Sequence, residues 1–164
     1  DHVRHALDAS GLSPDRLVVE ITETALMRDA DGAVARLQAL KDLGVLVAID
    51  DFGTGYSSLA YLRKFPVDAL KIDRSFVNAV VDSPESATLV HTLVELGRNL
   101  GLQTLAEGIE DSMQLQRLRD HDCELGQGFL FSAPVAPDVL ENMLNNSVRG
   151  DAAVTVPSAI PEMR

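Results

Sequence analysis

The sequence predicts an α/β fold in which five short strands alternate with helices and form a parallel sheet. Short apolar runs rich in β-branched residues recur about every 20–35 residues along the chain. Between these runs, apolar residues repeat every three or four positions, as on the buried face of a helix. Strands that are apolar almost throughout are typical of a parallel sheet whose two faces are both covered.

The same patterns give the limits of each expected element. Strands are expected over residues 17–23, 45–51, 69–73, 102–106 and 128–131. Residues 1–14 are expected to be the last part of a helix, and further helices are expected over residues 31–43, 57–64, 84–100, 111–118 and 138–144. Because the residues after Asn145 are small, polar and without periodicity, we expect one domain over 1–144 and a disordered tail over 145–164.

Two parallel architectures fit this alternation, an open doubly wound sheet and a (β/α)₈ barrel. No Gly-x-Gly-x-x-Gly turn follows any strand, which disfavours a dinucleotide-binding sheet. Polar residues stand at successive strand ends, as in barrel enzymes. They are Glu20, Asp50 with Asp51, Lys71 with Asp73, Glu107 and Gln127. We therefore expect a partial barrel made of about the last five βα units, with the first strands absent.

Composition limits the classes of function. The 164 residues are 46% hydrophobic and only 4% aromatic, so the core is aliphatic. The net charge of −11 disfavours a binder of nucleic-acid polymers, which needs a basic surface. No apolar run is long enough for a membrane span, and one cysteine leaves no internal disulfide. Since the chain begins with Asp, we expect it to be a piece of a longer protein.

The segment 46–58 carries the strongest chemical signal. An apolar strand ends in the adjacent carboxylates Asp50 and Asp51, and a loop with two glycines follows. Paired carboxylates repel each other and need a cation or a hydrogen-bond network to compensate them. A hard divalent ion such as Mg²⁺ suits them, because it prefers oxygen ligands. The alternative is a strand that runs out into solvent, with one carboxylate bonded to loop amides.

Other strand ends carry charged residues with similar alternatives. Glu20 can act as an inward-pointing metal ligand or as a helix cap. Glu107 can act as a general base or as a helix cap. Lys71 and Asp73 lie on one face of their strand. Lys71 could hold a water molecule while Asp73 belongs to the shell of a metal ion; the alternative is a simple ion pair between charged side chains. Glu23 suits a loop-holding role as well as catalysis.

Five motifs occur in order along the chain, over residues 19–23, 49–62, 71–77, 106–110 and 127–131. Together they closely resemble the EAL-domain family of cyclic-di-GMP phosphodiesterases. The resemblance covers roughly residues 10–144, about the last two thirds of such a domain.

The resemblance implies a (β/α)₈ barrel that hydrolyses cyclic di-GMP to linear pGpG with two Mg²⁺ or Mn²⁺ ions. Lys71 and Glu107 resemble the residues that position and deprotonate the attacking water. Four carboxylates correspond to metal-site positions, namely Glu20, Asp50, Asp51 and Asp73. The resemblance also suggests substrate or loop support by Glu23, Thr54, Ser57, Ser58, Glu110 and Gln127.

Two metal-binding motifs of the family, the Glu-Ala-Leu motif and a later Asn, do not occur in this chain. We expect them to lie in a preceding segment, and we expect the isolated chain to be inactive. The alternative function is a degenerate EAL domain that binds cyclic di-GMP or a protein without hydrolysis. The resemblance further implies a homodimer through the EAL domain, an upstream sensor or GGDEF-type domain, and a bacterial cytoplasmic location, alone or as the cytoplasmic part of a membrane-anchored protein.

Overall fold

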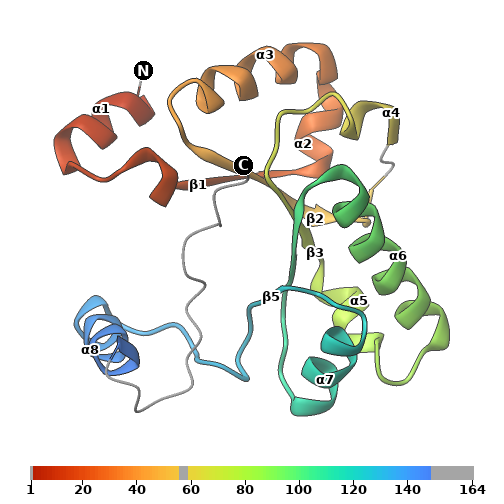
Figure 1. Ribbon diagram of the computed structural model, residues 1–164. Helices are drawn as coiled ribbons and strands as arrows, with labels where there is room; N and C mark the ends of the chain where they lie inside the picture. Colours follow the sequence, from red (N-terminus) through yellow and green to blue (C-terminus); the bar gives the residue numbers. More distant parts are fainter. Residues whose placement is uncertain (1, 56–58, 149–164) are drawn as a thin grey trace.

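A five-stranded parallel sheet forms the centre of the computed structural model, which describes residues 2–55 and 59–148. The strands lie side by side in sequence order, each paired with the next (Figure 1). They are β1 (Val18–Thr22), β2 (Leu46–Phe52), β3 (Ala69–Ile72), β4 (Gln103–Ala106) and β5 (Leu125–Gly126). A doubly wound sheet reverses its strand order at a switch point, whereas a (β/α) barrel adds each strand beside the one before it. The sheet is therefore an arc of a barrel, as the sequence predicts.

Helices connect the strands, and most of them pack along one side of the sheet (Figure 1). The helices are α1 (His2–Ser10), the 3₁₀ helix η1 (Pro14–Arg16), α2 (Glu23–Arg28), α3 (Ala30–Lys41), α4 (Leu59–Leu62), α5 (Arg74–Ala79), α6 (Pro84–Leu100), α7 (Ser112–Asp120) and α8 (Pro137–Val148). Within the described part of the chain, no helix combines the length and the apolarity needed to cross a membrane.

Local signals explain where the longest helix begins and ends. The Ser83 hydroxyl caps α6 by accepting a hydrogen bond from the Ser86 amide, and Pro84 occupies the first turn. Gly101 ends α6 in the left-handed conformation, with φ of 70°. Both limits agree with the sequence prediction.

The core lies between the sheet and the helices that cover it. Strands β2 and β3 supply fully buried side chains, including Val47, Ile49, Leu70 and Ile72. Helix α6 packs so closely on β4 that a Cβ atom added at Gly97 would lie 2.4 Å from the Thr104 methyl carbon. This aliphatic core fixes the strands, and therefore the side chains at their ends.

The largest errors in the expected boundaries lie at three places. The strand over 17–23 stops at Thr22, whose hydroxyl accepts a hydrogen bond from the Ala25 amide and caps α2, so Glu23 begins a helix. The last strand is β5, at 125–126, and residues 128–131 form a turn. Helix α8 begins at Pro137 and continues to Val148, past the expected start of the tail. Residues 149–164 of that tail lie outside the described part of the chain.

Candidate active site

Charged side chains from four adjacent strands meet at the carboxyl edge of the sheet. Glu20 lies on β1, Asp50 and Asp51 lie on β2, Lys71 lies on β3, and Glu107 directly follows β4. Parallel strands in consecutive order place all their carboxyl ends at one edge. The fold therefore brings together residues that are separated by up to 87 positions in the sequence (107 minus 20).

Lys71 is the centre of this group. Its side chain is 6% exposed, and its Nζ atom lies 2.8 Å from Glu20 Oε2, 2.9 Å from Asp50 Oδ1 and 2.7 Å from Glu107 Oε1. Burial lowers the pKa of the Lys71 ammonium, but the contacts with Glu107, Glu20 and Asp50 outweigh burial and raise the pKa above its ordinary value. Lys71 is therefore a fixed positive charge rather than a base.

A backbone irregularity brings two consecutive carboxylates to the same site. In a regular strand, neighbouring side chains point to opposite faces of the sheet. The pairing of β2 with β3 shifts register between Ile49 and Phe52, and Asp51 has the left-handed φ of 53°. Bulges of this kind re-aim side chains next to active sites. Asp51 consequently lies with Asp50 instead of opposite to it.

Three of these carboxylates are arranged as a possible metal site. Asp50, Asp51 and Glu107 each offer one oxygen, and these oxygens lie within 4.8 Å of one another. Asp50 Oδ1 is buried and close to Lys71 Nζ, but the contact lacks the direction of a hydrogen bond, so within the described residues this oxygen accepts none. Carboxylates outnumber the ammonium, and hard divalent cations prefer such oxygen ligands. The donor set therefore fits a divalent metal ion.

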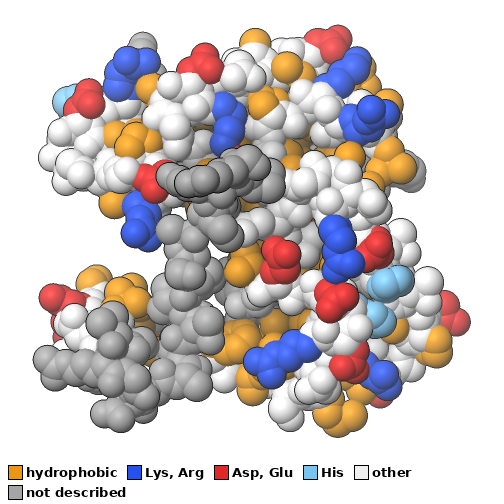
Figure 2. Space-filling model, in the orientation of Figure 1, with side chains coloured by type: hydrophobic (Ala, Val, Ile, Leu, Met, Phe, Trp, Pro, Cys, Tyr) orange, Lys and Arg blue, Asp and Glu red, His pale blue; other side chains and the backbone are white. Residues whose placement is uncertain are grey.

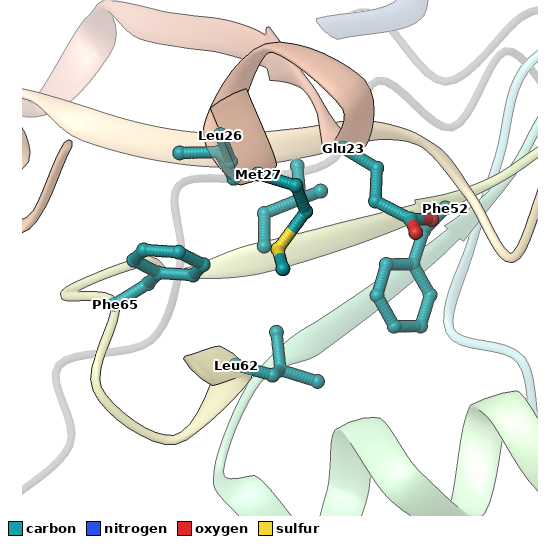
Figure 3. Close-up of a pocket in the computed structure, with 7 residues that line it drawn as sticks. Glu23, Leu26, Met27, Phe52, Leu62 and Phe65 are labelled. Carbon is teal, nitrogen blue, oxygen red and sulfur yellow. The ribbon is translucent and has the colours of Figure 1, made fainter. Parts of the chain in front are cut away.

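Glu23 is the first residue of α2, and its side chain contacts the loop that follows β2. Its side chain is 3% exposed, and its Oε2 accepts a hydrogen bond of 3.0 Å from the Gly53 amide in the loop after β2. Figure 3 shows the Glu23 carboxylate directed toward Phe52, at the wall of a small cavity that Leu26, Met27, Leu62 and Phe65 also line. A Cβ atom added at Gly55 would lie 2.6 Å from Glu23 Oε1, so the loop passes directly against this carboxylate.

Asp73 has a clear local partner. It caps α5, and its Oδ1 accepts hydrogen bonds from the Ser75 amide at 3.0 Å and the Ser75 hydroxyl at 2.5 Å. Burial raises the pKa of the Asp73 carboxyl, but the hydrogen bonds from Ser75 outweigh burial and hold the pKa below its ordinary value. Within the described residues, neither Asp73 nor Glu20 belongs to the three-carboxylate group.

The remaining predicted positions surround the site less closely. The exposed Thr54 hydroxyl donates to the Asp51 carbonyl at 2.8 Å. The Gln127 backbone pairs with Ala106 and Ile109, which places this exposed residue beside the end of β4. Glu110 is exposed in the loop before α7. Ser57 and Ser58 lie outside the described residues.

Two features of the site were not predicted from the sequence. One is the irregularity at Asp51, for which Gly53 close behind the paired carboxylates was the available signal. The other is the contact of Gly128 with the backbone of Ile109, where an added Cβ atom would lie 2.1 Å from the Ile109 carbonyl oxygen. Gly128 therefore fixes how the turn after Gln127 approaches the end of β4.

Comparison with known proteins agrees with this arrangement. The profile of the EAL domain matches residues 1–134. The chain belongs to the EAL domain family. It is 47% identical over 153 residues to a protein from Pseudomonas aeruginosa that is named cyclic di-GMP phosphodiesterase NbdA. The matched region is 93% of this chain and 19% of NbdA.

Solved EAL structures superpose well on this chain. A complex of the Pseudomonas aeruginosa phosphodiesterase MucR with c-di-GMP gives a TM-score of 0.81 at 44% identity, over 84% of this chain and 56% of that one. MucR is named a bifunctional diguanylate cyclase/cyclic di-GMP phosphodiesterase. A manganese/c-di-GMP complex of BlrP1 from Klebsiella pneumoniae gives a TM-score of 0.77 at 37% identity, over 81% of this chain and 34% of that one. The chain thus spans about a fifth of the length of its curated relatives NbdA and MucR.

Proposed function

We propose that the complete protein hydrolyses one phosphodiester bond of cyclic di-GMP, releasing linear pGpG, with divalent metal ions bound at the carboxyl edge of the sheet. The observation that carries this proposal is the convergence of Asp50, Asp51 and Glu107 around the buried Lys71. The names of NbdA and MucR and the c-di-GMP complexes of MucR and BlrP1 support the same substrate.

The proposed metal site consists of Glu20, Asp50 and Asp51, with Asp73 in the metal shell. Bound Mg²⁺ or Mn²⁺ would stabilise negative charge on the phosphodiester and activate water for attack. The manganese complex of BlrP1 supports a divalent cation of this type. Asp50 and Asp51 each offer an oxygen to the same small site, so they can bind one ion together or serve two neighbouring ions.

Lys71 and Glu107 act on the attacking water in this proposal. The Lys71 ammonium holds Glu20, Asp50 and Glu107 at fixed positions and orients water by donating to its oxygen. Glu107 Oε1 accepts a proton from that water, a type of step that typically contributes about 10²–10⁴-fold in rate. Four adjacent strands supply these groups, so the rigid sheet preorganises them.

Loop residues support the site. Glu23 holds the loop after β2 through the Gly53 amide, and Thr54 holds the same loop through the Asp51 carbonyl. We assign Ser57 and Ser58 to this loop function, and Glu110 and Gln127 to contacts with the substrate.

The assembly of the complete protein is part of the proposal. We expect a homodimer through the EAL domain and an upstream sensor or GGDEF-type domain, for which the bifunctional MucR offers a precedent. We expect these parts to work in the bacterial cytoplasm, alone or as part of a membrane-anchored protein. The chain by itself is expected to be inactive.

The test compares the complete protein with its Asp50→Ala and Asp50→Asn variants. We expect both variants to lower Mn²⁺-dependent pGpG release about 100-fold or more. Asp42→Asn, at the exposed end of α3, is the matched control and should keep full turnover. Equal turnover by wild type and the Asp50 variants would refute the metal assignment. Binding of cyclic di-GMP without any pGpG release by the wild type would favour the non-catalytic alternative.

A further inference from the structure

Positive charge is scarce at the carboxyl edge of the sheet. The strand ends and the residues that directly follow them are 20–24, 50–55, 71–75, 106–111 and 126–130. Within these described segments, Lys71 and Arg74 are the only cations. The acidic residues of the same segments are Glu20, Glu23, Asp50, Asp51, Asp73, Glu107, Glu110 and Asp111. An anionic ligand that approaches this edge therefore meets a strongly negative rim.

Lys71 cannot offset this repulsion. Its ammonium is buried and lies within 2.9 Å of carboxylate oxygens of Glu20, Asp50 and Glu107. The three carboxylates carry more negative charge than the ammonium carries positive charge, so the group as a whole repels an anion. Arg74 is the remaining cation at this edge, and its side chain is exposed.

The side chain of Arg74 lies against the loop that carries Glu107. Arg74 is the first residue of α5, directly after Asp73. A Cβ atom added at Gly108 would lie 2.6 Å from Arg74 Cβ and 3.8 Å from Arg74 Cδ. Gly108 has a left-handed φ of 71° and no side chain, so the backbone after Glu107 can pass this close to the arginine stem. Arg74 therefore stands beside the proposed base.

The fold does not use the guanidinium of Arg74 in an ion pair. Among the described residues, Arg74 takes part in none of the ion pairs. The neighbouring Asp73 carboxylate accepts hydrogen bonds from the Ser75 amide and hydroxyl instead. Figure 2 shows basic side chains scattered over the visible face rather than gathered in one patch, so that face offers an anion no general attraction. A single exposed arginine at the site is then the available anion contact.

We propose that Arg74 binds the substrate by donating hydrogen bonds from its guanidinium to the non-bridging oxygens of a phosphodiester group. This inference rests on the proposed function, because it assigns a residue to the same substrate. Both phosphodiesters of a cyclic dinucleotide are negatively charged, and both must approach the acidic rim. A planar guanidinium forms paired, charge-assisted hydrogen bonds with phosphate oxygens, whereas the ammonium of lysine acts as a point charge.

Steady-state kinetics of the complete protein with Mn²⁺ test this role. Arg74→Met keeps an unbranched stem beside Gly108 and removes the charge, so the KM for cyclic di-GMP should rise about tenfold or more, while kcat falls less than about threefold. Arg74→Lys keeps the charge without the paired donors and should give an intermediate KM. Arg63→Met, at an exposed position in the turn after α4, is the matched control and should leave both constants unchanged.

Salt dependence and direct binding give two further readouts. Between about 50 and about 500 mM KCl, the KM of the wild type should rise more steeply than that of Arg74→Met, since salt screens contacts between charges. Calorimetric titration with cyclic di-GMP in a Glu107→Gln background, which removes the proposed base, measures binding without turnover. In that background, Arg74→Met should weaken binding about tenfold or more.

The failure of this inference and the failure of the proposed function give different results. A KM and a dissociation constant of Arg74→Met within about twofold of the reference would overturn the role of Arg74 while the wild type still releases pGpG. Equal salt dependence of wild type and Arg74→Met would also overturn it, since the contact would then not be with a charged group. Absence of pGpG release by the wild type would instead refute the proposed function.

Discussion

Each edge of the sheet has a lysine in contact with acidic side chains, but the charges balance at one edge and not at the other. At the amino edge, Lys41 Nζ lies 2.7 Å from both oxygens of Asp68, and Asp68 Oδ2 also accepts from the Val47 amide at 2.8 Å. At the carboxyl edge, one lysine, Lys71, faces three carboxylates and is far more deeply buried. The balanced pair joins α3 to the loop before β3, whereas the unbalanced group has an excess of negative charge that can attract cations.

Replacing each lysine by methionine is the strongest test of this contrast. Lys71→Met removes a buried ammonium and leaves three clustered, partly exposed carboxylates without their cation, so we expect it to lower the free energy of unfolding by about 1.5–3 kcal/mol. Lys41→Met breaks a partly exposed pair and should cost about 1 kcal/mol. Urea-induced unfolding without divalent ions measures both values, and equal losses would contradict the contrast. Adding Mn²⁺ should restore part of the stability of Lys71→Met and none of that of Lys41→Met.

Exchanging one carboxylate for an amide at each edge should give effects of opposite sign. Asp51→Asn removes a like charge beside Asp50 and keeps a residue type that tolerates the left-handed conformation, so the metal-free protein should gain about 0.5–1 kcal/mol. Asp68→Asn removes the partner of Lys41 and should lose about 1 kcal/mol. Thermal unfolding in a chelating buffer measures both, and a loss of stability in Asp51→Asn would show that its charge is already compensated.

A smaller change in stability is expected at Asp73, which lies at the carboxyl edge of the sheet but, unlike Asp50 and Asp51, has local hydrogen-bond partners. Its pKa is lower in the folded than in the unfolded protein, where it is about 3.9. The stabilisation by Asp73 is therefore complete above that pH and is lost as the pH falls through the folded-state pKa. Asp73→Asn keeps a capping oxygen without titrating, so its unfolding free energy should fall less than that of wild type between about pH 5 and about pH 2. If the unfolding free energy of Asp73→Asn fell as much as that of wild type over this pH range, the hydrogen bonds of the Asp73 carboxylate with Ser75 would not stabilise the fold.

The sequence predicted those parts of the fold that depend on local chemistry. Helix α6 has a proline in its first turn and a glycine at its end, and both limits were correct. The consecutive strand order was predicted because polar residues recur at successive strand ends. Strand β5 was misplaced because only residues 125–126 pair, which is too short for any apolar pattern to mark.

The proximity of the charged side chains was more predictable than their geometry. Asp50, Lys71 and Glu107 were expected to lie together because each stands at or near the end of an apolar strand, and the sheet brings them into contact. Glu23 was placed on a strand, because the cap formed by Thr22 competes with a β-branched run that favours strand. The irregularity at Asp51 coincides with a register shift in the pairing with β3, a long-range contact that the nearby Gly53 signals but does not specify by itself.

That irregularity of the backbone has a consequence for protein engineering. A designer who copied only the side chains of this centre onto an even, unbroken strand would obtain one inward acid and one facing the opposite layer. Transplanting the centre therefore requires the kinked stretch of main chain around Asp51 as well, together with the neighbouring strand whose slipped alignment maintains it.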